Sequence, residues 1–65
     1  MDIIAEGHRI KDRLLACQTK SEVETVANEE REKVMAMKSM RGDGPAMFHQ
    51  IRYLKNYVLR DIEGK

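Results

Sequence analysis

The sequence has a single cysteine, Cys17, and two histidines, His8 and His49, among its 65 residues. One cysteine excludes an intrachain disulfide. With no CxxC or HxxxH spacing, these three residues also fall short of the four ligands of a structural zinc site. The chain therefore lacks the disulfide and the metal that often stabilise so small a domain. Its stability must come from helix packing, from self-association, or from both.

Long apolar runs are also missing, and none approaches the roughly 20 residues that a membrane-spanning helix needs. The first residues are acidic at Asp2 and Glu6, whereas a secretory signal begins with basic residues and an apolar segment. A lone thiol is typical of a reducing compartment. These features predict a cytoplasmic protein with no membrane partner.

Neither sign of charge dominates, because 12 Lys and Arg residues stand against 11 Asp and Glu residues. The overall charge therefore does not indicate a strongly basic nucleic-acid-binding protein. The distribution is uneven, however. Residues 21–40 carry three basic and five acidic residues, a net charge of −2, and residues 45–65 carry four and two, a net charge of +2.

The most regular apolar pattern predicts a helix over residues 45–61. Its apolar positions step by 4, 3, 4 and 4 residues, which keeps one helix face apolar. They are Met47, Ile51, Leu54, Val58 and Ile62. Pro45 suits the first helical position, with Asp43 before it to specify the start, and Gly42 can end the preceding helix in the left-handed conformation.

A second pattern predicts a helix over residues 2–17, with Asp2 as its N-cap. One face holds Ile3, Ile10, Leu14 and Cys17, and Ile4 and Leu15 widen it. Gly7 lies on the same face, where its lack of a side chain would let a neighbouring helix approach closely. The charged residues of this helix alternate in sign, which is typical of a solvated face.

The helix predicted over residues 21–40 has the best local start signal in the chain. Thr19 is followed three residues later by Glu22, and Ser21 by Glu24. Either pair matches the capping box, in which two side chains satisfy backbone N–H groups at a helix start. The sequence leaves open which pair is used.

The middle of this helix is its weakest part, because Glu30 interrupts the apolar face. That face is formed by Val23, Val26, Ala27, Val34 and Met37. Asn28 could cap a new helix, which would divide the segment in two, although we favour one continuous helix. The polar run over residues 28–33 is expected to be solvated.

These patterns predict an all-α fold, a small antiparallel three-helix bundle with helices over about residues 2–17, 21–40 and 45–61. No segment alternates at the period of two residues that marks a strand. Residues 1–65 are expected to form a single helical domain, because a chain of this length supports one core.

The candidates for chemistry are Cys17, His8 and His49, and their spacing does not bring a nucleophile to a base. Cys17 lies on the apolar face and is better explained as a small core residue. The chain also has no Gly-rich phosphate loop. We therefore expect no enzymatic activity, catalytic residue, metal, cofactor or small-molecule substrate.

The leading functional hypothesis is a small regulatory protein that docks a helical face on a protein partner. Apolar side chains outside the three core stripes, and methionines around the end of the second helix, suggest an adaptable binding surface. The candidate residues are Met35, Met40, Met47, Tyr53 and Tyr57. Two alternatives remain open: a second copy of the chain covers this surface, or the methionines simply fill an irregular core.

The alternative function is nucleic-acid binding by the basic side of the third helix. Basic residues beside tyrosines can contact phosphates and stack on bases. The candidate residues are Lys38, Arg41, Arg52, Lys55 and Arg60. The competing explanation is an ordinary solvated helix face with basic residues near its C-terminus, which the helix dipole favours.

Overall fold

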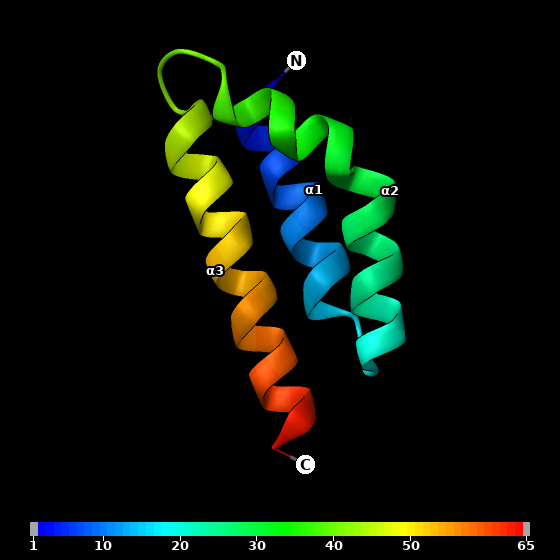
Figure 1. Cartoon of the computed structure of the whole chain (residues 1–65). Helices are drawn as coiled ribbons and strands as arrows, with labels where there is room; N and C mark the ends of the chain where they lie inside the picture. The colour runs from blue at the N-terminus through cyan, green and yellow to red at the C-terminus, as the bar shows by residue number, and fades with distance from the viewer. Residues whose placement is uncertain (1, 65) are drawn as a thin grey trace.

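The computed structural model describes residues 2–64, which form three α-helices joined by two short connections (Figure 1). The helices are α1 (Ile3–Leu15), α2 (Lys20–Lys38) and α3 (Gly44–Glu63). Consecutive helices run antiparallel, every pair is in contact, and no strand occurs within this described range. The predicted all-α antiparallel three-helix bundle is confirmed, and its helix boundaries lie within about two residues of those expected.

The first two helices begin as the sequence predicts. Asp2 Oδ1 accepts a hydrogen bond from the Ala5 N–H at 3.0 Å. Thr19 Oγ1 accepts one from the Glu22 N–H at 3.2 Å, and Glu22 Oε1 accepts one from the Gln18 N–H at 3.2 Å. The Thr19 and Glu22 pair is therefore the one that caps α2.

The start of α3 differs from the prediction in one respect. Asp43 occupies the N-cap position, but its side chain makes no capping hydrogen bond. Its backbone is helical, with φ −77° and ψ −6°, whereas a side-chain cap normally has extended backbone. Gly42 has the left-handed conformation that the sequence predicts, with φ +76°, and this reverses the chain after α2.

α2 is one continuous helix, as favoured from the sequence, and no new helix begins at Asn28. The ribbon nevertheless bends near its middle (Figure 1). Its first half lies beside α1, and its second half crosses towards the start of α3. α2 contains neither proline nor glycine, so no helix-breaking residue causes the bend.

The core is formed where the three apolar stripes meet. Its most deeply buried side chains are Ile10, Leu14, Val23 and Met37. The stripe predicted for α3 is confirmed, since Met47, Ile51 and Val58 are buried and Leu54 and Ile62 pack against them. Ile4 and Leu15 do not widen the α1 stripe, because each is about half exposed on the outer side of the helix.

Two glycines let helices approach one another closely. A Cβ at Gly7 would lie 2.6 Å from Cγ and Cε of Met47, so the absence of a side chain makes room for Met47, as predicted. A Cβ at Gly44 would overlap the Met37 carbonyl oxygen and lie 2.8 Å from the Met40 Cβ. Gly44 therefore lets the start of α3 sit against the end of α2.

We predict that Gly44→Ala destabilises the protein by about 1–3 kcal/mol, because backbone atoms, which cannot move aside as a flexible side chain can, must shift to admit the methyl group. Gly64→Ala is the matched control: at this exposed position the Cβ would lie 3.3 Å from the Arg60 carbonyl oxygen, so a shift of a few tenths of an ångström accommodates it. That variant should lie within about 0.5 kcal/mol of the parent. Urea unfolding followed by circular dichroism measures both, and equal midpoints would contradict the prediction.

Candidate functional site

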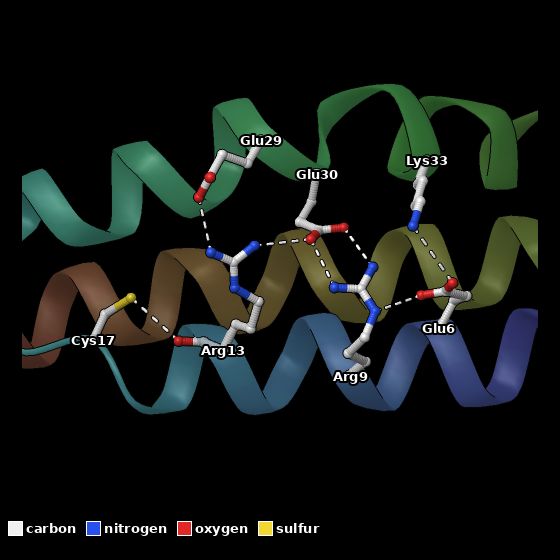
Figure 2. Close-up of polar contacts among 7 residues, drawn as sticks. All are labelled: Glu6, Arg9, Arg13, Cys17, Glu29, Glu30 and Lys33. Carbon is white, nitrogen blue, oxygen red and sulfur yellow. Dashed lines mark hydrogen bonds and ion pairs between the residues drawn. The ribbon is translucent and has the colours of Figure 1, made fainter.

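A charged network joins α1 to α2 inside the bundle. Glu30, whose residue is 6% exposed, receives two hydrogen bonds from Arg9 at 2.7 Å and one from Arg13 at 2.8 Å (Figure 2). The expectation that residues 28–33 form a solvated run is therefore wrong at Glu30. The arginines of α1 are likewise not a freely solvated face, because both point towards α2.

Further ion pairs extend this network along both helices. Arg9 Nε donates to Glu6 at 2.6 Å, and Arg13 Nη2 donates to Glu29 at 2.8 Å. Lys33 Nζ lies 3.5 Å from Glu6. These outer pairs are more exposed than Glu30, so solvent weakens them. The bidentate Arg9 contact has the most specific geometry and sets the position of Glu30.

The network lowers the pKa of Glu30 from its ordinary value of 4.5 to about 2. The hydrogen bonds from Arg9 are the main cause, those from Arg13 add to it, and burial opposes both. Glu30 is consequently a carboxylate at neutral pH, and its charge is compensated by two guanidinium groups.

The position of Glu30 also fixes which side chains of α2 face α3. Each residue of an α-helix turns the chain by about 100°. With Glu30 held against α1, Arg31 and Met35 are turned about 100° and 140° away from it. Both side chains lie beside a groove between α2 and α3.

This groove has a volume of about 300 Å³ and is bounded by all three helices. Its base is formed by the apolar side chains of Ile10, Leu14, Val26, Phe48 and Ile51. Its walls are formed by Ala27, Asn28, Arg31, Val34 and Met35 of α2 and by Arg52 and Lys55 of α3. The residues at the base are buried, so the groove is a preformed depression in the surface and does not open the core.

The rim of the groove is basic. Arg31 stands on one wall, and Arg52 and Lys55 stand on the other. None of the three forms an ion pair with another residue among positions 2–64. Of the described residues lining the groove, Glu30 alone is acidic, and Arg9 and Arg13 already compensate it. The groove thus combines apolar walls with three uncompensated positive charges.

The structure separates the residues predicted to bind a protein partner. Met35 is 48% exposed on the groove wall, and Met40 is half buried beside the start of α3. Met47 is buried against Gly7, so it belongs to the core and cannot form part of a docking surface. Tyr53 and Tyr57 are exposed on α3 outside the groove.

The residues predicted to bind nucleic acid are also divided. Arg52 and Lys55 line the groove, whereas Arg41 lies in the loop between α2 and α3. Arg60 follows Lys55 by five residues, which places it about 140° around the helix. Lys38 Nζ lies 5.4 Å from the centre of the Phe48 ring, but Lys38 does not itself line the groove. The five residues therefore do not form one basic face.

Sequence reasoning missed the contributions of Arg31, Ala27 and Phe48. A usable signal was present in two rows beside the core stripes. Arg31, Met35 and Lys38 on α2, and Phe48, Arg52 and Lys55 on α3, are each spaced by four and then three residues. Such spacing puts side chains on one helix face. What the sequence lacked was the rotation of each helix, which brings Arg31 and Met35 of the first row and all three residues of the second to the same groove.

The candidates for chemistry lie apart from this groove. Cys17 is half buried, and its Sγ donates to the Arg13 carbonyl oxygen at 3.3 Å. His8 and His49 are exposed. Across residues 2–64, no three His, Cys, Asp or Glu side chains are grouped as a metal site would require. Over the same range, no helix has the length and apolar character needed to cross a membrane.

Three comparisons with known proteins give no relative. No protein-family model, no curated protein and no solved structure matches the chain.

We predict that Glu30→Gln destabilises the protein by about 1–3 kcal/mol at pH 7, because two guanidinium groups lose a buried counter-charge. The exposure of Arg9 and Arg13, 41% and 37%, keeps the loss below that of a fully buried pair. Since the folded-state pKa of Glu30 lies below 4.5, its contribution is complete above that pH and is lost as pH falls towards 2.

Urea unfolding at several pH values measures this effect. The difference between the parent and Glu30→Gln should narrow as pH falls from 4.5 towards 2. Glu32→Gln is the control, because Glu32 is exposed and has no ion pair within the described chain. A constant difference across this pH range would show that the ionised carboxylate does not stabilise the fold.

We also predict slow alkylation of Cys17. Burial raises the pKa of its thiol, with a smaller contribution from the charge of Glu22, so little reactive thiolate is present at pH 7. Iodoacetamide should modify the native protein at least about tenfold more slowly than the urea-unfolded protein. Equal rates would contradict the prediction, and faster labelling of the native protein would indicate a reactive thiol and an enzymatic role.

Proposed function

We propose that this chain is a small, non-enzymatic interaction protein that binds a protein partner in the groove between α2 and α3. The observation that supports it most is the combination of a preformed apolar groove with unpaired charges on both walls. Ligand sites in proteins combine apolar walls with a few polar groups in the same way. The proposed location is the cytoplasm, in keeping with the unpaired Cys17.

The shape of the groove favours a helix as the docked element. α2 and α3 form its two sides, and α1 supplies Ile10 and Leu14 at its base. A helix laid between α2 and α3 would complete a four-helix arrangement, and grooves between helices commonly bind amphipathic helices. Met35, which is unbranched and flexible, can adapt its shape to such a partner.

Nucleic-acid binding is the second candidate, and the three unpaired cations of the rim are the observation that favours it. Phosphates would be attracted to Arg31, Arg52 and Lys55. Two features make it the weaker candidate. A polyanion would place its charges against the apolar wall at Met35, and Tyr53, which could stack on bases, lies outside the groove.

The proposal can be tested by cross-linking the chain to its partners in the native host and capturing the complexes. The parent chain and two variants are compared after nuclease treatment. Met35→Ser removes an exposed apolar side chain from the groove wall. It should reduce capture of the groove-dependent partner about tenfold, as expected for a loss of about 1.4 kcal/mol. Tyr57→Ser is the matched control, since Tyr57 is 58% exposed and lies outside the groove.

The outcomes separate the candidates. Capture that survives nuclease, falls with Met35→Ser and persists with Tyr57→Ser supports protein binding in the groove. Capture abolished by nuclease supports the nucleic-acid alternative. Capture that Met35→Ser leaves unchanged places the binding surface elsewhere and overturns the proposal.

A further inference from the structure

We infer that the partner contributes an acidic amphipathic helix, which lies in the groove with its apolar side against Met35 and its carboxylates against Arg31, Arg52 and Lys55. This inference rests on the proposed function and adds the chemical character of the partner.

The charge of the groove gives the first reason. Positive side chains stand on both walls, Arg31 on α2 and Arg52 and Lys55 on α3, without ion-pair partners within residues 2–64. Glu30 cannot supply the missing charge, because its oxygens already accept bonds from Arg9 and Arg13. Complementary charge selects partners and suppresses those of like charge. A basic helix would therefore be repelled, and an acidic one attracted.

The apolar surface between these charges gives the second reason. Ala27, Val34 and Met35 lie on the same wall as Arg31. A partner with only charged side chains would cover this apolar surface with hydrated polar groups, which do not pack against it. An amphipathic helix presents an apolar stripe flanked by polar residues, so it can contact the wall and the rim together.

The acidic surface of a second copy fits less well. The exposed acidic residues of α2 include Glu24 and Glu32, two turns apart, and exposed Asn28 stands between them on that face. The exposed apolar side chain on this side of α2 is Met35, which itself lines the groove together with Asn28. A second copy therefore has no separate apolar stripe on this face with which to cover the wall at Met35. A distinct acidic helix satisfies both parts of the groove.

Binding of designed peptides to the purified full chain tests the inference. Two fluorescent peptides of about 18 residues, or five helical turns, carry leucine at the same i, i+3, i+4 and i+7 positions. One has glutamate at most remaining positions, and the other has lysine. By fluorescence anisotropy, the glutamate peptide should bind at least about tenfold more tightly, and its affinity should fall between about 50 and 500 mM salt.

Charge reversal in the chain provides the second arm. The double variant Arg52→Glu/Lys55→Glu should weaken binding of the glutamate peptide at least about tenfold and favour the lysine peptide. Arg60→Glu, a single reversal on the same helix outside the groove, is compared with Arg52→Glu alone and should leave the preference unchanged. Circular dichroism checks that each variant keeps the helical content of the parent.

Several results would overturn the inference. These are equal affinity for the two peptides, no binding of either, or a preference that the groove variants do not alter. Tighter binding of a single-stranded oligonucleotide than of the glutamate peptide would assign the rim to phosphates. A dimer by light scattering that Arg52→Glu dissociates would assign the groove to a second copy. If any of these occurs while partner capture still depends on Met35, the chemical inference fails and the docking proposal stands.

Discussion

The structure depends on one buried carboxylate and the two arginines that surround it. Glu30 lies where an apolar residue would complete the stripe of α2. Its carboxylate accepts hydrogen bonds from Arg9 and Arg13 of α1, which are one helical turn apart. A buried carboxylate without partners would cost several kcal/mol, so α1 and α2 can pack closely only in the register that brings these groups together. Apolar side chains alone, being non-directional, would tolerate more sliding and rotation.

The register of α1 and α2 also determines which side of α2 faces α3. Because Glu30 faces α1, the neighbouring row of Arg31, Met35 and Lys38 is turned towards α3. α2 bends near its middle, so that one half of the helix lies beside α1 and the other approaches α3 at Gly44. Gly7 and Gly44 then set how closely the helices pack, and the groove between α2 and α3 is the space that this packing leaves.

The sequence predicts the helices well because each one is specified locally. The capping pair at Thr19 and Glu22, the left-handed Gly42 and the regular stripe of α3 involve residues a few positions apart, and all are confirmed. The burial of Glu30 cannot be predicted from the sequence, for the opposite reason. Its partners lie 17 and 21 residues away, and a carboxylate looks the same in a sequence whether water or two guanidinium groups surround it. The sequence predicts two incompatible roles for Met47, as a core residue and as a partner contact, and its burial against Gly7 assigns it to the core.

Contacts between residues far apart in the chain also explain why the sequence does not predict the groove. Its basic residues come from two helices, and sequence reasoning grouped Arg52 and Lys55 with Arg60 because they are close in the chain, although Arg60 points elsewhere.

The buried network also determines the charge of the groove. If the Glu30 carboxylate were free, it could pair with the cations that line the groove beside it. Arg9 and Arg13 instead occupy both of its oxygens from the α1 side, so the charges of Arg31, Arg52 and Lys55 remain uncompensated at the surface. The contact that holds α1 to α2 thereby leaves the rim of the groove between α2 and α3 positively charged.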